Sequence, residues 1–419
     1  MQSKVKTYLL QSLLLIITIL TTTAAGTEWM TGKSLFDTNS LWTNFKQGFY
    51  FSIPFLGILT VHEFGHYITA RIYKVRVTLP YYIPLYIPGL MAIGTLGAFI
   101  RIKSFLKTRR QVFDIGVAGP LAGFIAALII LFYGFTHLPP VEYIYKVHAQ
   151  YEKYGKDYAK YVYTPQFLKE ETIEQAKKEN ISLSRQDTTE FTSLSMGKNL
   201  LFLFFEKYVV KDKSLIPNKY EMFHYPFLLA GYLALFFTAL NLIPIGQLDG
   251  GHILYGLLGY KNHTRISTGL FVVFVFLAGI GIFRDNIVFG ILALFNIYGS
   301  DPAANAFSSN EHMVIFSIIY LYFLYIIFSR LTDSMLTNVM VAVVVFSIQF
   351  FIEFLFPEIK GFSGWFAFAF LIGRFLGVKH PPALVEQPLD TKRKIIGWLS
   401  LVIFIISFTP QLFQFEQIK

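Results

Sequence analysis

The sequence predicts an all-α polytopic membrane protein with about eight or nine transmembrane helices. The chain has 419 residues, of which 54% are hydrophobic and 15% are charged. Several apolar runs reach the roughly 20 residues that are needed to cross about 30 Å of hydrocarbon. The net charge of +10 suits this class, because Lys and Arg collect in cytoplasmic loops, so nucleic acid is not required as a partner.

The apolar runs give the positions of the spans. We expect spans at about 7–25, 49–72, 113–136, 222–243, 264–283, 312–329, 336–356, 361–377 and 394–412. The N-terminal run has a basic lead and ends in small residues, so it is either a cleaved signal or an uncleaved first span, and we favour a span. The stretch 286–299 is too short to cross comfortably and is expected to be re-entrant or peripheral, which keeps the basic residues near 374–394 inside.

Positive charge predicts the orientation. The loop after the second span carries a group of basic residues with no acid before Asp114: Arg71, Lys74, Arg76, Arg101, Lys103, Lys107, Arg109 and Arg110. Cytoplasmic loops are enriched in Lys and Arg, so this loop and the N-terminus are expected on the cytoplasmic side. Alternation then puts segment 137–221 and the C-terminus outside.

The spans and loops divide the chain into five segments. These are a first span with an external loop (1–48), a first part of the membrane core (49–136), an extracytoplasmic insert (137–221), a second part of the core (222–260) and additional spans (261–419). In the insert, Thr164 and Pro165 have the residue types of an N-cap and a first helical position. The insert is either a solvated cap without chemistry or a substrate filter over the membrane entrance.

The second predicted span contains a motif typical of metal sites, "TVHEFGHYIT" at 60–69. On a helix, residues i and i+4 share one face, so His62 and His66 can bind one ion. Glu63 is beside the first histidine and could take a proton from a water on that ion, as in the HExxH zinc hydrolases. A purely structural role gives no reason to bury three polar groups together in a membrane.

A third ligand is expected in "NLIPIGQLDGGHILYG" at 241–256, because zinc needs three protein ligands and one open position. Cysteine is absent from the chain, so the ligands must be His, Asp or Glu. Pro244 and the three glycines of this stretch favour irregular backbone, which at membrane depth is tolerated where it lines protein or a wet cavity. Asp249 and His252 are the two candidate ligands in this stretch, and the resemblance described next favours Asp249.

These motifs carry a resemblance. "HEFGH" and "NLIPIGQLDGGH" resemble the site-2 protease family of intramembrane zinc metalloproteases. "GTLGAFIRIKS" (94–104) and "GPLAG" (119–123) are similar to a membrane-associated β-loop and a Gly-rich turn of that family, and "GRFLGVKHPP" resembles the tail of a bacterial and plastid branch.

The resemblance implies one zinc per chain, bound by His62, His66 and Asp249, with Glu63 as the general base. It also implies that Asn241 contacts the substrate backbone or the reaction intermediate; ordinary interhelical hydrogen bonding is the alternative. The implied substrate is a transmembrane protein in the bilayer, such as a membrane-tethered transcription regulator, an anti-sigma factor or a signal peptide remnant. A bacterial inner membrane is the implied location.

A transmembrane substrate must unwind before it is cut, and an exposed strand edge could hold the unwound piece. Segment 94–104 alternates as a strand does, with Phe99 on one face. Gly94 and Gly97 would let a substrate backbone approach, although a purely structural hairpin fits equally well. The preceding "TLPYYIPLYIPG" is expected to be an interfacial loop near the headgroups.

Four further residues have expected structural roles. Asp114 is expected to be the N-cap of the third span. Gly119 and Gly123 fit close helix packing. His380 lies among basic loop residues and is expected at the interface.

Two other functions fit the metal motif. One is a membrane zinc hydrolase that acts on a lipid or a small amide. The other is a metal transporter or sensor that uses His62, His66 and Asp249 as a transit site. A transporter gives Glu63 no special role and predicts further ligands along a path, and the sequence offers none, so a protease is favoured.

Overall fold

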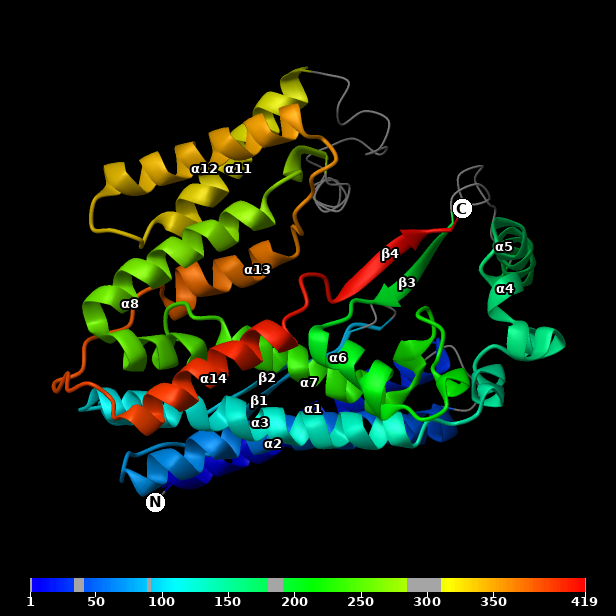
Figure 1. The fold of residues 1–419 in the computed structure, drawn as a ribbon, viewed down its shortest axis with the longest axis horizontal. Helices are drawn as coiled ribbons and strands as arrows, with labels where there is room; N and C mark the ends of the chain where they lie inside the picture. The colour runs from blue at the N-terminus through cyan, green and yellow to red at the C-terminus, as the bar shows by residue number, and fades with distance from the viewer. Residues whose placement is uncertain (1, 34–40, 89–91, 180–190, 285–309, 419) are drawn as a thin grey trace. The chain divides into compact units, whose positions relative to one another are not determined.

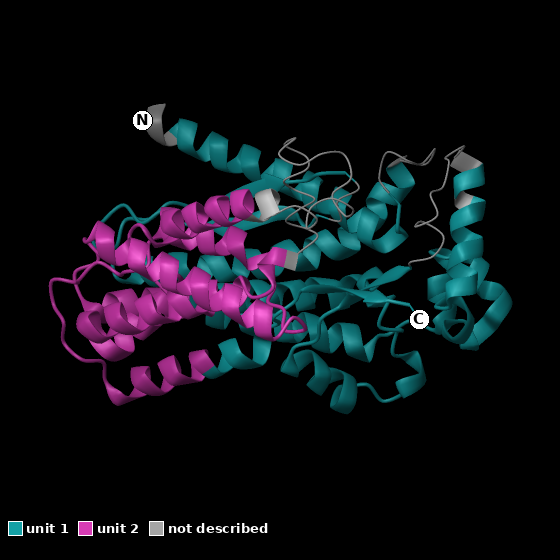
Figure 2. Ribbon diagram, turned by 90° about the horizontal axis from the view of Figure 1, so that it is seen from above, with its two compact units in different colours: residues 1–105, 118–241, 402–419 teal, residues 106–117, 242–401 magenta. Residues whose placement is uncertain are grey.

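The computed structural model describes residues 2–33, 41–88, 92–179, 191–284 and 310–418. These residues are mostly helical, and they fall into two compact units (Figure 2). Unit 1 comprises 1–105, 118–241 and 402–419, and unit 2 comprises 106–117 and 242–401. The stretch 286–299, predicted to be re-entrant, lies outside the described residues.

Unit 1 is built on long apolar helices (Figure 1). They are α1 (Gln2–Thr31), α2 (Leu41–Ile72), most of α3 (Arg109–Thr136) and α7 (Pro226–Leu242). Fully buried aromatic and aliphatic side chains from these helices, among them Phe51, Leu131 and Leu233, make one continuous core. Burial of such side chains is the main favourable term in folding, so this core fixes the positions of the polar residues that the helices carry.

The insert of unit 1 consists of short helices. They are η2 (Val141–Lys146), η3 (Ala149–Asp157), α4 (Ala159–Val162), α5 (Pro165–Glu179), α6 (Leu200–Phe204), η5 (Phe205–Val209), η6 (Lys213–Leu215) and η7 (Met222–His224). Helix α5 begins at Pro165, and the backbone N–H of Phe167 donates to Thr164 Oγ1 at 3.4 Å. The predicted N-cap is therefore confirmed.

A β-hairpin connects α2 to α3. Strand β1 (Tyr81–Leu85) pairs antiparallel with β2 (Gly94–Phe99), and a register shift leaves Leu96 without a partner across the pair. At one end, Gln11 Nε2 of α1 donates to the carbonyl of Leu79 at 2.6 Å. At the other, Trp29 Nε1 donates to the carbonyl of Ala92 at 3.1 Å.

Those two contacts on α1 are 18 residues apart, or about 27 Å at 1.5 Å per residue. The hairpin therefore follows α1 for most of the length of a span, and the prediction of an interfacial loop before it was wrong. Residues 81–85 form a strand instead. Backbone of this kind is tolerated at membrane depth because it packs against protein.

A second small sheet joins the insert to the end of the chain. Strand β3 (Thr192–Met196) pairs antiparallel with β4 (Phe413–Gln417), from Thr192 opposite Gln417 to Met196 opposite Phe413. The last span was predicted to run to 412, but its helix α14 (Thr391–Ser407) ends earlier and the chain continues as this strand. This pairing brings residues 192–196 of the insert together with residues 413–417.

Unit 2 contains the remaining helices. They are α8 (Asp249–Ala278), η8 (Ile282–Arg284), α11 (Asn310–Phe328), α12 (Met335–Leu355), α13 (Trp365–Phe370), η9 (Leu371–Leu376) and the first part of α14. Helix α8 is interrupted at Gly259, whose φ of 75° is the left-handed conformation that glycine adopts without strain. A helix thus starts at the predicted third ligand rather than at 264.

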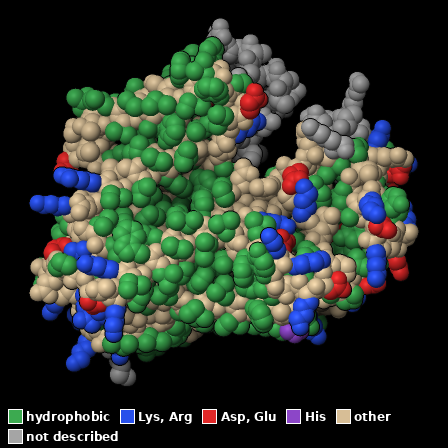
Figure 3. Space-filling model, in the orientation of Figure 1, with side chains coloured by type: hydrophobic (Ala, Val, Ile, Leu, Met, Phe, Trp, Pro, Cys, Tyr) green, Lys and Arg blue, Asp and Glu red, His purple; other side chains and the backbone are tan. Residues whose placement is uncertain are grey.

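Three described helices are long and apolar enough to cross a membrane: Val5–Thr31, Arg109–Thr136 and Met335–Leu355. Helix α2 does not belong to this group, since its two histidines and Glu63 lower its mean hydropathy. Hydrophobic side chains cover most of the face drawn in Figure 3, and Lys and Arg gather toward its left and right edges. Phe354 of α12 is 73% exposed and Ile129 of α3 is 62% exposed, as is expected of side chains that face lipid.

Candidate metal centre

The two histidines of α2 are placed as one pair of ligands. His62 and His66 are one turn apart, both are buried, and their Nε2 atoms are 3.1 Å from each other. Two ligands at about 2.05 Å from a tetrahedral zinc ion lie about 3.3 Å apart, so this spacing suits one ion between the rings. Glu63 is also buried, so all three polar side chains of the motif are buried on this apolar helix, as predicted.

Glycines of α2 and α3 make room for the two rings. A Cβ atom at Gly119 of α3 would lie 2.1 Å from His66 Nε2, and one at Gly123 would lie 3.0 Å from the Cβ atom of His62. From the other side, a Cβ atom at Gly65 would lie 2.5 Å from the carbonyl oxygen of Ala118. The predicted close packing of Gly119 and Gly123 is confirmed, and these glycines set the depth to which the histidines reach.

Asn241 contacts the histidine pair from α7. It occupies the last turn of that helix, which ends at Leu242 ahead of Pro244. Its Nδ2 atom is 3.4 Å from His62 Nε2. This contact is an interhelical hydrogen bond between α7 and α2, and the same amide could donate to a substrate carbonyl, so both expected roles of Asn241 stay open.

Asp249 is the first residue of α8, in unit 2. The six-residue connection from α7 is tightly folded: a Cβ atom at Gly250 would lie 2.0 Å from the carbonyl oxygen of Leu242, and one at Gly251 would lie 2.2 Å from that of Gly246. Gly246 itself has a φ of 61°. The glycines of the motif therefore fix the turn from which the Asp249 carboxylate projects.

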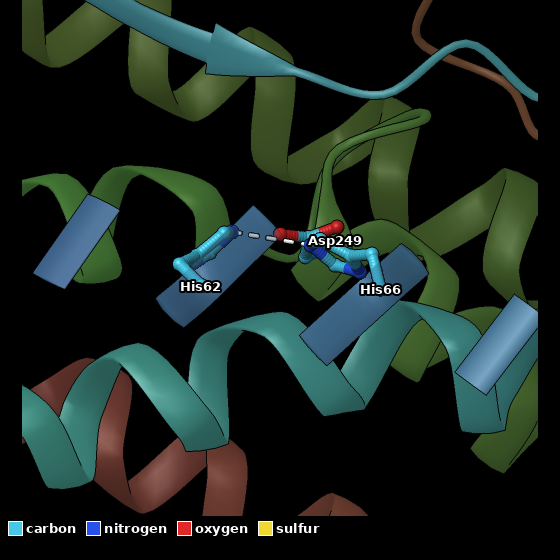
Figure 4. A group of neighbouring side chains, drawn as sticks. All are labelled: His62, His66 and Asp249. Atoms are coloured by element: carbon cyan, nitrogen blue, oxygen red, sulfur yellow. Dashed lines mark hydrogen bonds between the residues drawn. The ribbon is translucent and has the colours of Figure 1, made fainter. Parts of the chain in front are cut away.

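His62, His66 and Asp249 make up one of the two candidate metal-binding groups among the described residues. Figure 4 draws the three side chains, with the two histidines on one side of α2.

His252, the rival ligand, is engaged within unit 2. Its Nδ1 atom is 2.9 Å from His380 Nε2, and the ring of His380 stacks on Tyr255 with centroids 4.2 Å apart. His380 is 5% exposed, so its predicted place at the interface was wrong. The segment that contains His380 instead packs against the start of α8. The two histidines in contact are 128 positions apart, so local composition does not reveal this contact.

Asp114 was predicted to be an N-cap, and this was wrong too. Helix α3 begins at Arg109, so Asp114 lies inside its second turn. Its two carboxylate oxygens accept from Nε and Nη2 of Arg393, at 2.7 and 2.9 Å. A bidentate pair of this kind joins the start of α3 to α14 within unit 2.

The predicted substrate-binding residues of β2 differ in their surroundings. A Cβ atom at Gly94 would lie 2.3 Å from the Cα atom of Thr22, so this glycine packs against α1. Gly97 has open space, and Phe99 is 47% exposed and stacks on Tyr81.

A hydrogen bond that sequence reasoning missed connects the hairpin to the motif helix. Thr60 lies two residues before His62 in the chain. Its Oγ1 atom is 2.8 Å from the hydroxyl oxygen of Tyr82.

Comparisons with known proteins match the part of the chain that contains these residues. The model of peptidase family M50 matches residues 50–280. A probable zinc metalloprotease of rice, EGY2 (chloroplastic), is 27% identical over 223 residues, which are 53% of this chain and 32% of that protein. EGY1 of Arabidopsis thaliana, also named a probable chloroplastic zinc metalloprotease, is 28% identical over 207 residues, or 49% of this chain and 29% of that protein.

The chain thus matches about a third of the length of these curated relatives. No solved structure matches it.

Proposed function

Because this chain belongs to peptidase family M50, the site-2 protease family, we propose that it is an intramembrane zinc metalloendopeptidase that cuts transmembrane segments of other proteins. The observation that carries the proposal is the buried set of His62, Glu63 and His66 on an apolar helix, with the two imidazole Nε2 atoms 3.1 Å apart. Ionisable side chains are costly to bury inside a membrane, so their presence there indicates a function.

The proposed zinc ligands are His62, His66 and Asp249. The spacing of the two imidazoles suits one ion, and two imidazoles with one carboxylate are a ligand set that zinc prefers in catalytic sites. Asp249 is preferred to His252 because its carboxylate belongs to one candidate metal-binding group with the imidazoles of His62 and His66, and His252 does not. When bound, zinc would act as a Lewis acid and lower the pKa of a water molecule to about 7.

The residues of the chain would carry out the proton transfers and hold the substrate. Glu63 accepts a proton from the attacking water and delivers it to the leaving amine. Asn241 donates from its amide to the substrate carbonyl as negative charge develops there, which is where a fixed donor contributes most. The burial of Glu63 and the histidines keeps bulk water from competing for these hydrogen bonds.

The proposed holder of the substrate is the edge of β2 that does not face β1. In the described part of the chain β2 pairs with β1 alone, and Leu96, at the register shift, is 60% exposed. Gly97 leaves space for an approaching backbone, and the Thr60–Tyr82 hydrogen bond fixes the hairpin to the helix that carries Glu63. A substrate unwound along this edge would have its peptide bonds free for hydrolysis.

The proposed setting is a bacterial inner membrane, with the N-terminus on the cytoplasmic side. The basic residues after α2 support that orientation. Transmembrane regulators, anti-sigma factors and signal peptide remnants are the proposed substrates.

The test compares purified full-length wild type with Glu63→Gln in detergent micelles. The probe is a fusion protein with one apolar segment of about 20 residues that contains a central Gly-Pro pair to favour unwinding. Zinc content is measured by mass spectrometry and cleavage by gel. We expect equal zinc in both proteins and cleavage by wild type alone, because the substitution keeps the shape of Glu63 and removes its basicity.

A third protein, His62→Asn with His66→Asn, reports on the metal. It should contain one zinc equivalent less than wild type and cleave nothing. Equal zinc in all three proteins would contradict the ligand assignment. Cleavage by Glu63→Gln at the wild-type rate would contradict the assignment of the base. If wild type binds zinc but does not cleave the probe, a lipid hydrolase or a transporter would be favoured.

A further inference from the structure

A second group of metal-ligating side chains lies in the insert, away from the HExxH motif in sequence. It consists of His148, between η2 and η3, and of Glu221 and His224, at η7. All three belong to unit 1. Glu221 and His224 are each 2% exposed, and His148 is half-buried.

The three ligand atoms form a nearly equilateral triangle. His148 Nε2 is 3.4 Å from His224 Nε2 and 3.5 Å from Glu221 Oε2, and His224 Nε2 is 3.4 Å from Glu221 Oε2. Ligands at about 2.0–2.1 Å from a tetrahedral zinc ion are separated by about 3.3–3.4 Å. The triangle therefore has the size of one face of a zinc coordination tetrahedron, with the fourth position left for water.

Hydrogen bonds around the triangle orient the ligands as metal sites require. His224 Nδ1 is 2.6 Å from the carbonyl oxygen of Trp29, and a carbonyl can only accept, so Nδ1 carries the proton. The neutral ring then presents the lone pair of Nε2 to the triangle. Histidine ligands commonly donate their other N–H to a carbonyl in this way.

The carboxylate oxygen of Glu221 that points away from the triangle, Oε1, is held by a hydrogen bond. Its Oε1 atom accepts a hydrogen bond from the hydroxyl of Tyr163. Its Oε2 atom is buried and has no hydrogen-bond partner.

The two histidines do not satisfy that oxygen by hydrogen bonding. His224 Nε2 lacks a proton, and His148 Nε2 at 3.5 Å is beyond good hydrogen-bond length. A buried carboxylate oxygen left in this state costs free energy, and a cation in the triangle would remove the cost.

We propose that His148, Glu221 and His224 bind a second divalent transition metal ion, zinc by the nature of the ligands, in addition to the one proposed at the HExxH motif. The ion would join the beginning of the insert, at residue 148, to its end, at residues 221–224. Through His224 it would also connect both to the C-terminal end of α1. Closing a loop of more than 70 residues gives it a structural role in holding the insert on the helices.

The experiment counts zinc in the full-length protein in detergent after dialysis. Wild type should hold two equivalents, and His148→Ala with His224→Ala should hold one. His62→Asn with His66→Asn should also hold one, and the four-fold variant none. His137→Ala, at the first residue of the insert and outside the triangle, should keep two. Zinc in the His148/His224 variant equal to that in wild type would overturn the proposal, whatever happens at His62 and His66.

A second measurement covers the case in which the His148/His224 variant does not fold. Protein with His62→Asn and His66→Asn is stripped with chelator and digested with trypsin, with and without added zinc. Zinc at about 100 times its Kd should slow cleavage within 141–221 about 100-fold, because it binds only the closed insert. Unchanged digestion and no bound zinc would overturn the proposal. The HExxH centre is absent from this variant, so failure of the proposed protease function would leave the result unaffected.

Discussion

Replacing Gly119 by Ala tests whether helix packing positions the zinc ligands. The added Cβ atom would lie 2.1 Å from His66 Nε2, whereas ordinary contacts begin at 3.4 Å. His66 or the α3 backbone must therefore move by about 1.3 Å, the difference between these two distances. Metal–ligand distances tolerate changes of about 0.2 Å, so the ring cannot stay in coordinating position unless the helices separate.

The substitution should affect stability less than it affects zinc affinity. Separating well-packed helices costs about 1–3 kcal/mol, and Ala in place of Gly in a helix interior recovers about 0.5–1 kcal/mol. We expect a net loss of about 0–2.5 kcal/mol in the free energy of unfolding. Zinc affinity at His62 and His66 should fall by at least 10- to 100-fold, the range known for changes beside metal ligands.

The assay is competition for zinc with a chromogenic chelator, alongside thermal unfolding and cleavage of the transmembrane probe. Gly57→Ala on α2 is the matched control, because a Cβ atom there would have no neighbour within 4 Å. It should bind zinc and cleave as wild type does. If Gly119→Ala kept wild-type zinc affinity and activity, the positioning of His66 by α3 would be refuted.

Three further predictions concern unit 2. Asp249→Asn should lose the catalytic zinc and all cleavage while His252→Asn keeps the zinc, since His252 lies outside the group formed by His62, His66 and Asp249; zinc analysis of the two variants checks this. Gly250→Ala puts a Cβ atom 2.0 Å from the Leu242 carbonyl oxygen, so cleavage should fall at least 10-fold as Asp249 shifts, and a kcat measurement with intact zinc-site histidines tests it. His380→Ala should lower the free energy of unfolding by about 1–3 kcal/mol, as seen in denaturant titration, and leave the zinc in place.

The features that depend only on neighbouring residues could be predicted from the sequence. The pairing of His62 with His66 follows from helix periodicity alone, and the start of a helix at Pro165 follows from its cap. Asp249 was identified by its motif, in which the glycines make sense only in a tightly folded turn.

Contacts between distant residues were the ones missed. Asp114 looks like a cap until Arg393, 279 positions later, accounts for both of its oxygens. Position 380 looks interfacial until the tail folds back over α8. The His148–Glu221–His224 triangle is assembled from two ends of the insert, and sequence offers only a Glu-x-x-His spacing for it.

The central claim is that Glu63 and the zinc ligands cut a peptide bond inside the membrane. The most direct measurement is mass spectrometry of both fragments of a transmembrane substrate that is incubated with wild type in lipid bilayers, with Glu63→Gln as the blank. The account predicts one dominant cut within the apolar segment and no fragments from Glu63→Gln. Cuts confined to the flanking soluble loops, or the same fragments from both proteins, would contradict it.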